Sequence, residues 1–333
     1  MTMLRIGDLS QHFISLRHGV ALRSALAKQT EQLASGRHSD LPRALGAAQA
    51  RHTQAAFRLG EISEYLTSAK TAARFASAQQ LGFEQINGAR ELLSARLIDP
   101  ATTQAPGQIS GHAAAAKAAF ADVTAALNAA TGGRYTFGGT SVSQPPLIGA
   151  DAHLLALTAT LAGGGVADSI EAAVNTWFGA GGGYETTALQ GDDQPVTFPL
   201  DGHTMIRLPA GAAHGAIRNV LSGLALAAVA GDQTIPLDDA TRQDLLQRAG
   251  RGLHRAAGPL VDLMATVGQS QFRIEVTTER LTAEQIELSR HHNDATLIEM
   301  ESTATRIQLL QVQLETHYTL VNRLSRLSLA TLS

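Results

Sequence analysis

Apolar side chains recur every seven residues along the C-terminal part of the chain. Between residues 246 and 288 every heptad position of one register is leucine, isoleucine or valine: Leu246, Leu253, Leu260, Val267, Ile274, Leu281 and Leu288. A period of 3.5 residues is typical of a helix that packs along another helix. Proline removes a backbone donor, so Gly258-Pro259 is expected to kink or interrupt this helix. The pattern predicts a long packed helix with a break near residue 258.

A second run with the same spacing follows His291-His292-Asn293-Asp294, which we interpret as a turn. Its apolar positions are Met300, Ile307, Leu310, Leu314, Val321 and Leu324. This spacing predicts an amphipathic helix at the C-terminal end of the chain.

The N-terminal part carries matching patterns. A weaker amphipathic stretch stops at Ser35-Gly36 and contains Phe13, Leu16, Val20, Leu26 and Leu33. A longer seam, which Asp99-Pro100 should end, contains Leu59, Ile62, Leu66, Ala69, Ala73, Ala76 and Phe83. An alanine-rich helix is expected over residues 111–130.

The middle of the chain differs in charge. Residues 135–206 contain no lysine or arginine and seven acidic side chains. Asp201-Gly202 lies between short apolar runs, which predicts a β-hairpin over residues 196–208. We therefore expect a small Gly-rich acidic middle domain at 141–236, flanked by the two parts of a helical rod domain at 43–140 and 237–293. Terminal assembly helices would occupy 1–42 and 294–333.

These patterns predict a mainly α fold. It would be an elongated antiparallel bundle of long coiled-coil-like helices from both termini, with a small inserted mixed or β-containing domain. Each terminal helix has an apolar stripe that it cannot bury alone. The pattern leaves two partners open, the other terminus of the same chain or a neighbouring molecule.

Composition excludes several classes of protein. The chain has 333 residues, no cysteine and a formal net charge of −3. Thiolate metal sites and disulfides are therefore excluded, and a nucleic-acid partner is not expected. The most apolar window, 220–230, is too short to span a membrane, and residues 1–8 lack the apolar stretch of a secretory signal.

Candidate chemistry is sparse. His291, His292 and Asp294 have metal-ligand side chains, but adjacent helical positions point about 100° apart, so a solvated turn is the ordinary interpretation. Trp177-Phe178 is interpreted as a core aromatic pair. Arg323 and Arg326 flank the C-terminal seam and could pair with acids of a neighbouring protein. No catalytic residue, cofactor or metal is predicted.

Several segments resemble the flagellin superfamily. Residues 32–37 are similar to the segment that follows the first helix of that family, and Val267-Gly268 to the start of its long C-terminal helix. A hairpin motif of the family matches Gly133, Arg134, Tyr135, Phe137, Gly139 and Thr140. The ending 323–329 resembles the hook-associated branch, which joins hook to filament. The turn after the first helix is shortened here to residues 39–44.

The resemblance implies a structural protein, not an enzyme. It would be exported unfolded without a cleaved signal peptide and would act outside the cell at the hook–filament junction. Its partners would be copies of itself, the hook-proximal hook-associated protein, flagellin, and an export chaperone on the C-terminal helix. The terminal helices would order on assembly, with Leu314 and Val321 in the interface.

Two alternatives remain. Within the same superfamily the chain could be a minor filament flagellin. A more remote alternative is a soluble metal-dependent hydrolase on a helical scaffold, which predicts that purified protein retains a metal.

Overall fold

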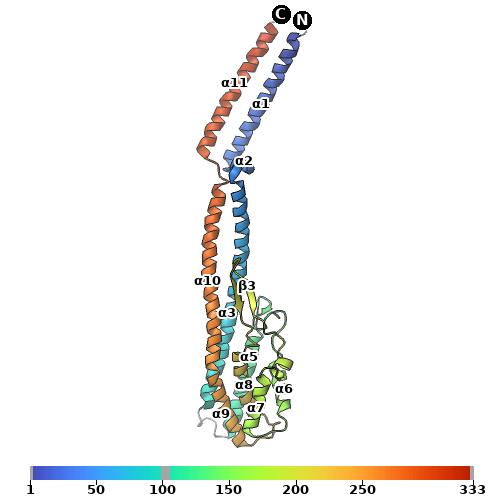
Figure 1. The fold of residues 1–333 in the computed structure, drawn as a ribbon, viewed down its shortest axis with the longest axis vertical. Helices are drawn as coiled ribbons and strands as arrows, with labels where there is room; N and C mark the ends of the chain where they lie inside the picture. The colour runs from blue at the N-terminus through green and yellow to red at the C-terminus, as the bar shows by residue number, and fades with distance from the viewer. Residues whose placement is uncertain (1–2, 99–105, 331–333) are drawn as a thin grey trace. The chain divides into compact units, whose positions relative to one another are not determined.

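The structure is a computed structural model that describes residues 3–98 and 106–330 (Figure 1). Its long helices are α1 (Met3–Ser35), α3 (Gln49–Ile98), α5 (Pro106–Leu127), α10 (Ala257–Asp294) and α11 (Met300–Ala330). Together with two small antiparallel sheets they confirm the predicted mainly α fold with a small β-containing region. Asp99-Pro100, the predicted end of the N-terminal seam, lies outside the described residues.

Contacts divide the chain into two units. Unit 1 contains residues 1–61 and 283–333, and unit 2 contains residues 62–282. Helices α3 and α10 each contribute to both units. The middle segment 141–236 shares one hydrophobic core with residues of α3, α5 and α10. The sequence predicted five segments, a finer division than these two contact units. That finer division remains a prediction.

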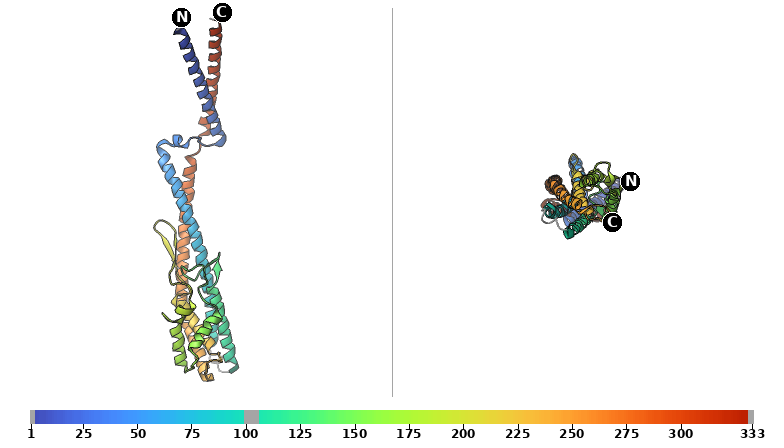
Figure 2. Two further views of the ribbon diagram at one scale, coloured as in Figure 1. Left: turned by 90° about the vertical axis from the view of Figure 1, so that its right-hand side faces the viewer. Right: turned by 90° about the horizontal axis from the view of Figure 1, so that it is seen from below.

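Unit 1 is built from the two chain ends. Helices α1 and α11 lie side by side and run in opposite directions (Figures 1 and 2). Between α1 and α3 the chain forms α2 (Leu41–Leu45) and a short 3₁₀ turn, η1 (Gly46–Ala48). The shortened turn thus becomes a one-turn helix, whose first turn is capped by the Asp40 carboxylate accepting from the Arg43 amide.

Unit 1 has an N-terminal arm, residues 1–61, and a C-terminal arm, residues 283–333. A short backbone pairing joins these two arms. Gly36, at φ 69°, ends α1, and its amide donates to the Gln32 carbonyl at 2.8 Å. The His38 amide donates to the Thr296 carbonyl at 3.0 Å, and the Ile298 amide donates to the Gly36 carbonyl at 3.1 Å. This pairing fixes where α1 and α11 begin to run along each other.

The expected turn at residues 291–294 is wrong. Helix α10 continues through Asp294, and the chain turns only at residues 295–299. The polar run contains no proline or glycine, so nothing in it breaks the helix.

The predicted heptad seam is confirmed along α9 (Asp239–Arg255) and α10. Its positions from Leu246 to Leu281 are buried, and Leu288 is half-buried. The predicted interruption is confirmed too, because α9 ends at Arg255 and α10 begins at Ala257, with Pro259 in its first turn.

Unit 2 has its core around α8 (Gly215–Val229), the most apolar stretch of the chain. Helix α8 packs against α5, α9 and α7 (Ala167–Phe178), while α6 (Ala150–Thr160) packs against α5 and α7. Residues 220–227 of α8 are all buried, which explains why this part of the helix is almost entirely apolar. A π-helical turn, η2 (Tyr184–Ala188), follows α7.

Both sheets are two-stranded hairpins. Strands β1 (Ala130–Thr131) and β2 (Arg134–Tyr135) are joined by Gly132-Gly133, both at positive φ. Strands β3 (Val196–Pro199) and β4 (Met205–Leu208) flank Asp201-Gly202, so the hairpin predicted there is confirmed. The hairpin lies beside α3 (Figure 2). There Phe198 contacts Phe75 at a ring-centroid distance of 5.7 Å.

Asn128 ties the end of α5 to the segment before α6. Its amide nitrogen donates to the Leu147 carbonyl, and its amide oxygen accepts from the Leu147 amide, both at 2.9 Å. We expect Asn128→Ala to lower the free energy of unfolding by about 2 kcal/mol, because both backbone groups of a buried residue lose their partner. Urea denaturation followed by Trp177 fluorescence measures this, with exposed Asn219→Ala as control. A loss below about 0.5 kcal/mol would contradict this assignment.

Candidate assembly surface

The inner faces of α1 and α11 form a seam. On α1 these buried or half-buried positions are Ser15, Gly19, Leu22, Leu26, Gln29 and Leu33. On α11 they are Thr303, Ile307, Leu310, Leu314, His317 and Val321. Both sets advance by alternate steps of three and four residues, which is the heptad spacing of a two-helix contact.

Helices α1 and α11 approach closely where Gly19 faces His317. A Cβ atom added at Gly19 would lie 2.9 Å from Nε2 of His317. The ring of His317 also meets that of His18 edge-on, with centroids 5.5 Å apart. The α1–α11 seam therefore contains small and polar residues as well as leucines.

A second set of apolar side chains on the same two helices remains exposed. On α1, Phe13, Leu16 and Val20 are 63%, 49% and 57% exposed. On α11, Leu309, Val312 and Leu320 are 56%, 61% and 53% exposed. We call these six residues the outer stripe.

Helix geometry places each half of the outer stripe on one side of its helix. At 100° per residue, Leu309, Val312 and Leu320 fall within about 80° of one another, away from the Leu310 seam position. About 100–180° round the helix from Leu309 and Leu320, α11 exposes the polar side chains Gln308, Gln311 and Glu315. The three exposed apolar residues of α11 are thus grouped on one side of that helix, as at a surface that takes a partner.

The structure separates the assembly residues that the sequence grouped together. Leu26, Leu33, Ile307, Leu310, Leu314 and Val321 lie in the α1–α11 seam. Phe13, Leu16, Val20, Met300 and Leu324 are exposed. Their role in assembly remains a prediction, but only the exposed set is free for another molecule without opening the α1–α11 pair.

A change of helix face explains this division on α1. From Val20 to Leu26 the chain advances six residues, which rotates the side chain by about 240°. The two apolar runs therefore cannot share a face. The spacing in the sequence already showed that the two apolar runs lie on different faces of α1. Which of the two faces packs against α11 could be learned only from the structure.

The hairpin motif lies in unit 2. Gly133 is in the tight turn, Arg134 is exposed and Tyr135 is half-buried. Phe137 is buried and meets Phe83 edge-on at 5.3 Å. Phe137 anchors the motif in the core, so these residues have a structural role in unit 2.

Asp192 holds the end of this motif. Its carboxylate accepts from the Thr140 amide and the Gln194 amide, both at 2.9 Å, and from the Thr140 hydroxyl. Burial raises the pKa of Asp192, but these hydrogen bonds outweigh it and lower the pKa overall. Gly139 sits at φ 66°, where a Cβ would lie 2.0 Å from the Asp192 carboxylate, which is why only glycine fits.

The histidines considered as metal ligands are occupied with other contacts. His291 Nε2 lies 2.9 Å from the Glu287 carboxylate, and His292 stacks on His52. Within residues 3–98 and 106–330, no group of three or more His, Asp or Glu side chains is placed to hold a metal ion. The side chain of Arg323, for which the sequence suggested an ion pair with a neighbouring protein, is exposed.

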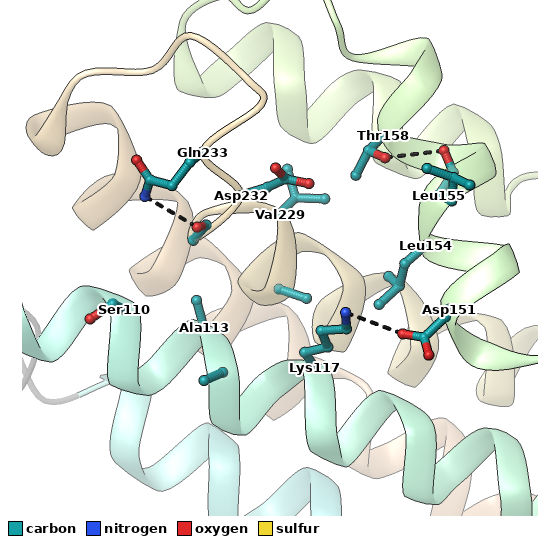
Figure 3. Close-up of a pocket in the computed structure, with 13 residues that line it drawn as sticks. Ser110, Ala113, Lys117, Asp151, Leu154, Leu155, Thr158, Val229, Asp232 and Gln233 are labelled. Atoms are coloured by element: carbon teal, nitrogen blue, oxygen red, sulfur yellow. Dashed lines mark hydrogen bonds and ion pairs between the residues drawn. The ribbon is translucent and has the colours of Figure 1, made fainter.

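Sequence reasoning missed a groove in unit 2 between α5, α6 and the end of α8 (Figure 3). Its volume is about 680 Å³, and small residues such as Ala113 and Gly231 line it. On its rim, Lys117 pairs with Asp151 at 3.1 Å, and both side chains are mostly exposed. Because this ion pair is solvated, it does not form the desolvated acid–base pair of a typical active site.

In the part of the chain that the structure describes, no helix is both long and apolar enough to cross a bilayer.

Comparisons with known proteins show the fold. No protein-family model matches the chain, and no curated protein matches its sequence. A solved structure from Vibrio parahaemolyticus, described as a candidate flagellar hook-associated protein, is similar with a TM-score of 0.51 at 10% identity. The match covers 75% of this chain and 97% of that one. FlgL of Bacillus cereus and FlgL of Xanthomonas campestris align with TM-scores of 0.49 at 11% identity, covering 73% of this chain and 98% and 99% of theirs.

Proposed function

We propose that this chain is a structural component of the bacterial flagellum that joins hook to filament. Three observations support the proposal: the sequence motifs that resemble the flagellin superfamily, the fold shared with a flagellar hook-associated protein, and the outer stripe. The outer stripe carries the most weight, because its two halves, one on each terminal helix, are apolar sets that the α1–α11 pair does not bury.

The outer stripe is suited to binding a helix of a neighbouring molecule. A helix with an exposed face of leucine, valine and phenylalanine is stabilised when another helix covers that face. Copies of this chain, the adjacent hook-associated protein and flagellin are the proposed neighbours. A flagellar export chaperone would cover the C-terminal helix of the unfolded chain before it leaves the cell.

Chemical catalysis is not part of this proposal. The buried polar groups of unit 2 described above hold the fold together, and the groove beside α5 carries a solvated ion pair. We therefore assign the chain no catalytic, cofactor or metal site.

The outer stripe provides the sharpest test. Val20→Asp and Val312→Asp place a carboxylate on the stripe while leaving the inner seam intact. We expect each variant to be exported normally and to reduce the number of cells with filaments at least about tenfold, because a buried unpaired charge costs well over 1.4 kcal/mol at an interface. Electron microscopy of hooks and blotting of the medium measure the two quantities.

A matched control lies on the opposite flank of α11. Gln311→Asp adds the same charge at an exposed polar position, so filaments should form at the parental level. By contrast, Leu314→Asp and Val321→Asp should prevent incorporation by opening the α1–α11 seam as well. Normal assembly of Val20→Asp and Val312→Asp would refute the role of the stripe.

Deleting the gene separates the junction role from that of a minor flagellin. A junction protein is required for the filament to attach, so its loss should leave bare hooks and release flagellin into the medium. Shortened but attached filaments would instead indicate a minor flagellin.

A further inference from the structure

Two histidine rings from different arms of unit 1 stack on each other. His52 lies in the first turn of α3, and His292 lies in the last turn of α10. Their ring centroids are 4.0 Å apart and their planes differ by 23°. Nε2 of His52 and Nδ1 of His292 are shielded from solvent and have no hydrogen-bond partner among the described residues.

Charged groups near the stack are paired with one another or exposed. Arg58 of α3 binds Glu284 of α10 at 2.8 Å, and Glu287 pairs with His291. The other charged side chains of this stretch are exposed at Arg51, Arg290 and Asp294, and in the preceding segment Asp40 pairs with Lys28. Across the part of the chain that the structure describes, no ion pair joins a carboxylate to either stacked ring.

We propose that the His52–His292 stack is a pH-sensitive latch between the N- and C-terminal arms of unit 1. Two neutral imidazoles stack favourably through their ring faces. Protonation of both rings places two positive charges about one ring thickness apart, with no nearby carboxylate bonded to either ring to offset the repulsion.

The direction of the pH effect follows from the contact. Burial, and then the positive charge of His52, lower the pKa of His292 below its usual value. The separated arms therefore bind protons more readily than the closed contact. The latch is complete above about pH 6.5, the ordinary histidine pKa, and is lost as the pH falls below that value.

Spin labels can measure the latch in the full chain. Because the protein has no cysteine, Gln54→Cys and Asn293→Cys introduce two labels at exposed positions of α3 and α10 without removing any other thiol. We expect the label-to-label distance distribution to be narrow at pH 8 and to lengthen and broaden reversibly as the pH is lowered to 5. The single tryptophan, Trp177, lies in unit 2, so unchanged fluorescence shows that unit 2 stays folded.

Two variants decide the outcome. His52→Phe/His292→Phe keeps two stacked rings but cannot be protonated, so its distance distribution should not change with pH. His291→Gln, next to the latch, should keep the parental transition. An unchanged distribution in the parent, or a transition that persists in the double phenylalanine variant, would overturn the proposal. If the double variant does not fold, the single variant His292→Phe, which can carry only one of the two charges, should likewise show no change with pH.

Discussion

Arg242→Ala is expected to lower the free energy of unfolding by about 4 kcal/mol, the largest single-residue effect on stability that we expect in unit 2. The side chain of Arg242 is only 5% exposed. Its guanidinium donates to four backbone carbonyls of the segment between α8 and α9, those of Ala230, Asp232, Ile235 and Leu237, at 2.6–3.3 Å.

The physical reason is the number of carbonyls that lose their donor. Water cannot easily reach the buried groups, so each one bears part of its desolvation cost after truncation. Arg242→Lys should recover only part of the stability, since an ammonium group cannot reach four carbonyls in the fork geometry of a guanidinium.

Arg251 provides the matched control on the same helix. Its side chain is 60% exposed and lies 4.0 Å from the Asp244 carboxylate. Arg251→Ala should therefore change the free energy of unfolding by less than about 0.5 kcal/mol. Guanidinium denaturation followed by Trp177 fluorescence measures both variants. A change under about 1 kcal/mol for Arg242→Ala would show that the segment does not depend on this guanidinium.

The second large effect is a loss of stability in mild acid caused by His153. This side chain is fully buried on α6, where its Nε2 accepts from the Trp177 indole at 3.2 Å. Rings of Phe120, Phe178 and Tyr184 surround it with centroids 5.1–5.5 Å away. The predicted core pair Trp177-Phe178 is confirmed as part of this cluster.

Burial lowers the pKa of His153 from 6.5 to about 4. The unfolded chain therefore takes up a proton near pH 6.5 while the folded chain does not, so stability is complete above pH 6.5 and falls as the pH drops toward 4. The difference is worth about 3 kcal/mol in total, of which about 2 kcal/mol should be lost between pH 7 and pH 5.

A comparison of pH profiles isolates this effect. His153→Gln retains an oxygen that can accept from Trp177 but does not titrate, so its unfolding free energy should change much less between pH 7 and pH 5. Exposed His203→Gln should follow the parent. Parallel profiles for the parent and His153→Gln would mean that His153 is not the group responsible.

Local patterns predicted much of the fold. The heptad positions from Leu246 to Leu281 predicted a buried seam, and Pro259 predicted its interruption. Asp201-Gly202 predicted the β3–β4 hairpin. Each of these signals acts within a few residues of the chain, so no knowledge of the partner segment was needed.

The candidate surface was less predictable. The sequence identified apolar residues on both terminal helices but left open what covers them. The α1–α11 pair buries Leu22 and Leu310 and leaves Val20 and Val312 exposed. The expected turn at residues 291–294 was wrong because polar residues alone do not end a helix.

The sequence by itself determined that this protein is mainly helical, where its seams and hairpins lie, and that both chain ends carry apolar stripes. The tertiary structure alone decided which stripe is sealed by α1 and α11, that Arg242 holds the segment after α8, and that His52 meets His292. The physical reason is distance along the chain. Periodicity and turn chemistry act over one or two helical turns, whereas these contacts join residues that become neighbours only when the chain folds back on itself.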